Sequence, residues 1–106
     1  MIVILLHVDG CPSLQVAQDR LVRALDLLGR GDVTVEQHRV TSDEEAQRIG
    51  FRGSPTIVVD GVDLFPGAPD GPFGLSCRLY PTEDGLAGSP TLDQLVRALA
   101  PSPTGT

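Results

Sequence analysis

The chain of 106 residues contains no lysine and no tryptophan, and its only tyrosine is Tyr80. Without lysine, no side chain can form a Schiff base or serve as an amine base. No apolar run reaches membrane-spanning length, so a transmembrane segment is not expected. The formal net charge of −6 argues against binding to nucleic acid or to an anionic membrane. We therefore expect neither a nucleic acid nor a membrane among the partners of this protein.

Cysteine is also scarce, since only Cys11 and Cys77 are present. Two cysteines and two distant histidines do not supply the four well-spaced ligands of a zinc site, so we expect no metal site and no cofactor. Met1 leads directly into an apolar run, without the basic region or cleavage site of a signal peptide, which favours a cytoplasmic location. In a reducing compartment, two cysteines are more often reactive or metal-binding than structural.

The composition is that of a folded globular chain, with 41% hydrophobic and 21% charged residues. A length of 106 residues favours one domain. We place that domain at residues 1–101 and expect residues 102–106, after Pro101, to form a flexible tail.

Hydrophobic periodicity and turn residues predict the order β-α-β-α-β-β-α. Strands are expected at 1–8, at 33–40 on a sheet edge, and at 56–59 and 62–65, which an Asp60-Gly61 turn would join as a hairpin. Helices are expected at 12–28, 43–49 and 92–99. Residues 66–76 and 81–89 read as loops, and residues 77–80 as a brief extended segment. Helical crossovers predict that the first three strands are parallel.

Two short motifs lie at the ends of these predicted strands. His7-Val8-Asp9-Gly10-Cys11-Pro12 separates the first strand from the first helix, and Gly53-Ser54-Pro55-Thr56 opens the third strand. The first motif resembles the active-site corner of thioredoxin-like proteins, and the second resembles their cis-proline loop. The resemblance covers most of the chain outside about residues 66–88. The chain also resembles a group of short thioredoxin-like proteins, some of which carry an alkylmercury-lyase label. This second resemblance lies in the spacing of Gly10-Cys11-Pro12, Gly50-Phe51-Arg52-Gly53-Ser54-Pro55-Thr56 and Leu75-Ser76-Cys77-Arg78-Leu79-Tyr80.

This resemblance implies a thioredoxin-like three-layer α/β sandwich with a mixed four-stranded sheet. It also implies a cis Ser54–Pro55 bond, at which the backbone of Ser54 is presented to an extended substrate in the manner of strand addition. Pro12, Arg52, Ser54 and Pro55 are then the candidate substrate-binding residues.

Cys11 is the candidate nucleophile. At the N-cap of the first helix, free N–H groups and the positive end of the helix dipole would favour its thiolate. Asp9, two residues earlier, opposes a second negative charge, and Arg52 could restore the balance if its loop faces Cys11.

The sequence departs from the dithiol pattern at Leu14, three residues after Cys11, where a second cysteine would resolve a mixed disulfide. Cys77 is the remaining candidate for that resolving role. Cys11 and Cys77 also suit a soft metal ion, and Asp9 could deliver a proton during cleavage of a carbon–mercury bond. Cys11, Cys77 and Asp9 are therefore the candidate catalytic residues.

Three functions remain open. The first is a monothiol oxidoreductase or thiol-transfer protein that acts on a small thiol or a protein disulfide through Cys11. The second is a non-catalytic thioredoxin-like scaffold that binds a partner through the sheet edge or the proline loop. The third is a handler of soft metal ions or organomercurials that uses Cys11 and Cys77. The sequence leaves the oligomeric state open.

Overall fold

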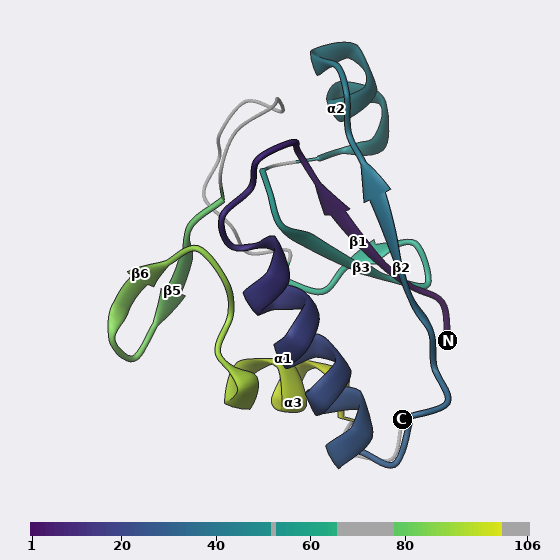
Figure 1. The fold of residues 1–106 in the computed structure, drawn as a ribbon, viewed down its shortest axis with the longest axis vertical. Coiled ribbons are helices and arrows are strands. Elements are labelled where there is room, and N and C mark those ends of the chain that lie inside the picture. The colour runs from purple at the N-terminus through teal and green to yellow at the C-terminus, as the bar shows by residue number, and fades with distance from the viewer. Residues whose placement is uncertain (52, 66–77, 101–106) are drawn as a thin grey trace.

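The structure is a computed structural model that describes residues 1–51, 53–65 and 78–100. These residues form a mixed α/β fold with a four-stranded sheet, three helices and a separate two-stranded hairpin (Figure 1). In chain order the elements are β1 (Val3–His7), α1 (Leu14–Leu27), β2 (Val35–Arg39), α2 (Asp43–Ile49), β3 (Thr56–Val59), β4 (Val62–Asp63), β5 (Tyr80–Thr82), β6 (Gly85–Ala87) and α3 (Leu92–Leu99).

The strands of the larger sheet are arranged in the order β2-β1-β3-β4. β1 is parallel to β2, with Leu5 opposite Gln37, and antiparallel to β3, with Leu5 opposite Ile57. β4 is antiparallel to β3. The predicted edge position of β2 is therefore confirmed, whereas the prediction of three parallel strands is wrong.

The short length of α2 explains the direction of β3. The helix has seven residues, so it spans only about 10 Å at 1.5 Å per residue. A five-residue strand such as β1 spans about 17 Å. The helix therefore does not return the chain to the start of the sheet, and β3 begins beside the carboxyl end of β1.

The larger hydrophobic core lies between the sheet and the helices α1 and α3, which pack side by side on one face (Figure 1). β1 contributes Val3 and Leu5, which alternate with residues on the opposite face. The helices contribute Ala17, Leu21, Ala24 and Leu25 from α1 and Leu95 and Leu99 from α3. The helical spacing in the sequence thus identified the buried sides of both helices.

A smaller core covers part of the opposite face of the sheet. It consists of Leu6, Val40, Ala46 and Phe51, so α2 packs at one end of this face only. The Ser42 hydroxyl accepts the Glu45 N–H at the start of α2, and Gly50 ends the helix with a φ of 73°. Together the helices and the sheet form three layers, of which the α2 layer is incomplete.

Two segments differ from the sequence predictions. The first α-helical hydrogen bond of α1 joins the Ala17 N–H to the Ser13 carbonyl, so the helix begins after Ser13 and not at Pro12. Residues expected to form a loop contain the β5–β6 hairpin, in which Tyr80 lies opposite Ala87. The expected hairpin around Asp60-Gly61 is present, with φ values of 51° and 85° at these residues, as a type I′ turn requires.

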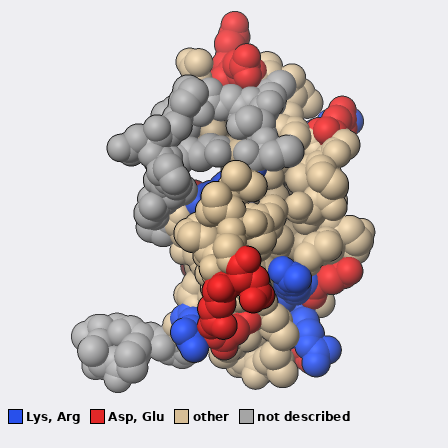
Figure 2. All heavy atoms as spheres, turned by 90° about the vertical axis from the view of Figure 1, so that its left-hand side faces the viewer, with Lys and Arg blue, Asp and Glu red and all other residues tan. Residues whose placement is uncertain are grey.

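In the described part of the chain, no helix has the length and apolar character needed to cross a membrane. Figure 2 shows acidic and arginine side chains close to one another on the displayed face, without a continuous basic area. This distribution agrees with the net charge of −6.

The packing of α1 leads to a prediction about stability. Leu21 is fully buried in the larger core, so Leu21→Ala should lower the free energy of unfolding by about 2–5 kcal/mol. Val22, the next residue of the helix, is 48% exposed, and Val22→Ala should change the free energy of unfolding by less than about 0.5 kcal/mol. Urea denaturation followed by circular dichroism measures both. Equal losses for the two variants would contradict this assignment of the buried face.

Candidate functional site

Cys11 lies in the connection between β1 and α1. The Cys11 N–H donates to the Val8 carbonyl at 3.4 Å, and the Leu14 N–H donates to the Cys11 carbonyl at 3.4 Å. These two bonds form consecutive turns that bring the chain from the strand into the helix. Cys11 is therefore a half-buried free cysteine two residues before the N-cap Ser13, and the expectation that it is itself the N-cap is wrong.

The amino end of α1 is left without a side-chain cap. The Ser13 side chain accepts no hydrogen bond from the first turn, and that turn contains no acidic residue. By contrast, Ser42 caps α2, and Thr91 forms a capping box with Gln94 at α3. The first turn of α1 therefore has neither a side-chain acceptor for its N–H groups nor a carboxylate opposite the positive end of its dipole.

The proline loop lies directly beside this connection. The Val8 N–H donates to the Ser54 hydroxyl at 3.1 Å, which joins the end of β1 to the loop that precedes β3. The Ser54–Pro55 bond is cis, the isomer that the resemblance implies, and Ser54 is only 1% exposed. Within the loop, the Thr56 hydroxyl donates to the Gly53 carbonyl. The loop is thus held in place by hydrogen bonds from two sides.

Tyr80 covers the proline loop from the β5 strand. Its hydroxyl donates to the Pro55 carbonyl, and its ring meets Phe65 edge to face with centroids 5.5 Å apart. Burial raises the pKa of Tyr80 above its usual value, Arg78 opposes this rise, and the charges of Asp63 and Cys11 add to it. The structure therefore brings Ser54, Pro55 and Tyr80 together at one corner of the fold, beside the connection that bears Cys11.

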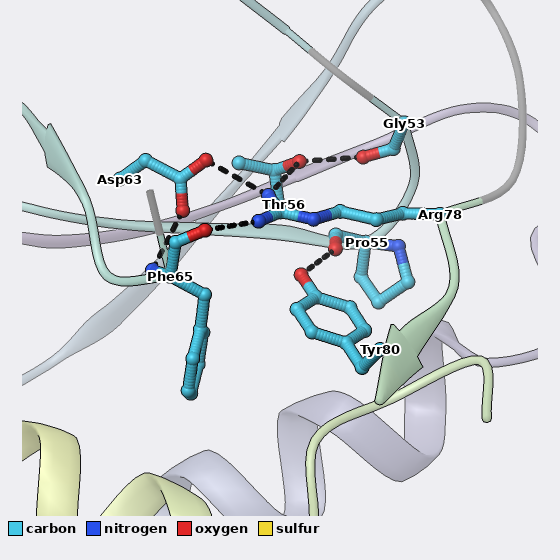
Figure 3. Close-up of polar contacts among 7 residues, drawn as sticks. All are labelled: Gly53, Pro55, Thr56, Asp63, Phe65, Arg78 and Tyr80. Carbon is cyan, nitrogen blue, oxygen red and sulfur yellow. Dashed lines mark hydrogen bonds and ion pairs between the residues drawn. The ribbon is translucent and has the colours of Figure 1, made fainter. Parts of the chain in front are cut away.

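Arg78, two residues before Tyr80, also makes contacts at this corner (Figure 3). Its backbone N–H donates to the Ser54 carbonyl at 3.0 Å. Its side chain, 3% exposed, crosses the Tyr80 ring at 4.7 Å from the centroid and hydrogen-bonds to the Asp63 carboxylate, the Phe65 carbonyl and the Thr56 hydroxyl. Its Nε is buried without a partner among the described residues. The segment that begins at Arg78 is thus anchored to β3, β4 and the proline loop.

Asp63 is the counterion of this buried guanidinium. One carboxylate oxygen accepts from Arg78 at 2.8 Å, and the other accepts the Phe65 N–H at 2.8 Å. A buried charge is tolerated only when it is paired and hydrogen-bonded in this way. The last residue of the short strand β4 therefore fixes the position of Arg78.

The remaining candidates from the sequence are placed as follows. Asp9 is exposed, and its carboxylate binds Arg39 at the end of β2 at 3.1 Å. Pro12 is exposed in the turn before α1 and is not the first helical residue. Arg52 and Cys77 lie outside the described residues. Among the residues that are described, no group of three metal-ligating side chains converges.

Sequence reasoning missed the roles of Arg78 and Tyr80. The extended segment 77–80 had been expected, and in an extended chain residues two apart project to the same side. Arg78 and Tyr80 have this spacing, and Leu79 between them is 55% exposed. The alternation was visible in the sequence, but the contact with the proline loop was not.

A hollow of about 430 Å³ lies on the opposite face of the sheet, beyond the incomplete α2 layer. Its apolar lining includes Ile4, Leu6 and Val58, and Cys11 is not among its lining residues. The half-buried Cys11 therefore lies outside this hollow.

Comparisons with protein-family models, curated proteins and solved structures found no match to this chain.

The burial of Tyr80 gives a spectroscopic prediction. It is the only tyrosine in the chain, so the absorbance of tyrosinate reports on this residue alone. In the folded protein it should ionise well above about pH 10, and in denaturant near that value. Because the folded state holds the proton more tightly, the contribution of Tyr80 to stability should be complete below about pH 10 and decline above it. A folded-state titration that overlays the denatured one would contradict this burial.

The ion pair gives a second prediction. Asp63→Ala leaves the buried Arg78 charge without its counterion and should lower the free energy of unfolding by about 3 kcal/mol. Asp93→Ala is the matched control, because Asp93 pairs with Arg97 on the exposed surface of α3 and should cost less than about 1 kcal/mol. Chemical denaturation measures both losses. Losses of similar size would show that the Arg78 pair is not buried in solution.

Proposed function

We propose that this protein has a thioredoxin-like fold and works as a monothiol protein in thiol transfer or redox exchange through Cys11. The fold proposal is supported by the chain order from β1 to α3 and by the sheet order β2-β1-β3-β4. The cis-proline loop at the start of β3, beside the connection that bears the cysteine, supports it further. The β5–β6 hairpin before α3 is an addition to the predicted order.

One observation carries the functional proposal: a free, half-buried cysteine precedes an uncapped helix, in a connection whose Val8 N–H binds the Ser54 hydroxyl of the cis-proline loop. Local backbone N–H groups can stabilise a thiolate there, and the thiolate is the reactive form. Asp9 opposes this less than expected, because its carboxylate is exposed and bound to Arg39. The same placement of Asp9 gives the soft-metal alternative no support.

The proposed reaction uses a single thiol of the active site. The sulfur of Cys11 attacks one sulfur of a disulfide, a new sulfur–sulfur bond forms, and the other half of the disulfide leaves as a thiolate. A second thiol then attacks the mixed disulfide and restores Cys11. Leu14 packs against the larger core at the position where a dithiol protein would carry its second cysteine, so the second thiol comes from elsewhere. Cys77 or an external thiol can fill that role.

Alkylation kinetics test the proposal. In a Cys77→Ser variant, Cys11 is the only thiol, and the chain without both cysteines gives the baseline. At pH 6 the folded variant should react with iodoacetamide at least about tenfold faster than the same chain in urea, as the proposed nucleophilic role of a cysteine before an uncapped helix requires. Folded-state reactivity equal to or below that of the unfolded chain would reject the proposal and favour a non-catalytic scaffold.

A further inference from the structure

We infer that the proposed thiol site acts on small thiols and disulfides and excludes polypeptides, because residues 78–80 of the chain occupy the edge that a peptide would use. The inference rests on the proposed function and selects its substrate class. Strand addition requires main-chain hydrogen-bonding groups that are free on the receiving edge. At the proline loop, that edge is the backbone of Gly53 and Ser54.

The carbonyl of Ser54 already has a main-chain partner. The Arg78 N–H donates to it at 3.0 Å, in the manner of an added strand. The approach is close enough that a Cβ at Gly53 would lie 3.0 Å from the Arg78 backbone nitrogen and 2.9 Å from the Arg78 Cβ. A second extended chain therefore has no room beside Gly53 and Ser54 while Arg78 stays in place.

Side-chain contacts hold the occupying segment in position. The Arg78 guanidinium binds Asp63, Phe65 and Thr56, and the Tyr80 hydroxyl binds the Pro55 carbonyl (Figure 3). Releasing the segment would break these bonds together and would leave the Asp63 carboxylate without its counterion. Residues 78–80 are thus held at this edge by several side-chain contacts at once and are part of the packed structure.

A small molecule can approach the connection that bears Cys11, because Cys11 is only half-buried and its neighbours Gly10 and Pro12 are exposed. A disulfide with a few atoms on each side needs only the sulfur of Cys11 and no main-chain bonds to the proline loop. In the exchange, the Cys11 thiolate bonds to one sulfur of the small disulfide, the old sulfur–sulfur bond breaks, and the departing thiolate takes a proton from solvent.

Two probes with the same reacting group test this inference. One is bis(2-hydroxyethyl) disulfide. The other is a twelve-residue extended peptide whose central cysteine carries a 2-mercaptoethanol disulfide. Each rate with the folded Cys77→Ser variant is divided by the rate with the same chain in urea, and mass spectrometry follows the mixed disulfide on Cys11. The normalised rate for the peptide should be at least about tenfold lower, because the peptide finds its edge occupied.

A variant then weakens the anchor of the segment. Asp63→Ala in the same background should raise the ratio of the normalised peptide rate to the normalised small-disulfide rate about fivefold or more, because Asp63 holds Arg78 against the edge that the peptide needs. Asp93→Ala should change neither rate. If Asp63→Ala does not fold, the comparison of the two probes on the parent chain still decides whether peptides are excluded.

The outcomes separate the two proposals. Equal normalised rates for the two probes on the parent chain would overturn the exclusion of peptides and leave the thiol function standing. If neither probe reacts faster with the folded chain than with the unfolded chain, the proposed function fails and the inference fails with it.

Discussion

The buried ion pair between Arg78 and Asp63 is the interaction on which the candidate site depends. It joins the segment that leads into β5 to the end of the short strand β4. With Arg78 in place, its N–H reaches Ser54, and Tyr80 reaches Pro55. A guanidinium that is 3% exposed requires partners for its donors, and the surrounding carboxylate, carbonyl and hydroxyl supply most of them. The position of the proline loop beside Cys11 is therefore maintained by a charge far along the chain.

The two sides of the candidate site, the proline loop and the cysteine-bearing connection, differ in how far their polar groups are paired within the protein. On the side of the proline loop, the Ser54 hydroxyl and the carbonyls of Gly53, Ser54 and Pro55 each accept a hydrogen bond within the protein. On the side of the cysteine, the first turn of α1 has neither a capping side chain nor a carboxylate. The other two helices, α2 and α3, are both capped by side chains. The missing cap at α1 is therefore a feature of the residues at its own amino end. A capping carboxylate there would compete directly with a thiolate at Cys11.

The sequence predicted the elements that a few neighbouring residues determine. It did not predict features that depend on contacts between residues far apart in the chain. Leucine spacing identified α1 and α3, and Asp60-Gly61 identified the hairpin turn, because both signals are contained in a few neighbouring residues. The direction of β3 depends on how far α2 carries the chain, which the pattern of α2 does not reveal. The three-residue strands β5 and β6, one of which contains Pro81, are too short for periodicity to detect. Cys11 and Pro55 were found from motifs, whereas the anchoring of Arg78 needed three-dimensional contacts.

Leu14 occupies the position at which a dithiol protein would carry its second cysteine, and it has a packing role there. Its position three residues after Cys11 is where a resolving thiol would lie, but its side chain packs against the core beneath α1. A cysteine there would replace a leucine with a smaller side chain and leave part of this contact unfilled. A second thiol three residues after Cys11 is therefore replaced by a residue that packs the helix following the site against the core. In the proposed function, Arg78 would limit the access of peptides and Leu14 would leave the resolving step to Cys77 or an external thiol, so small thiols that approach Cys11 from solvent are the proposed partners in exchange.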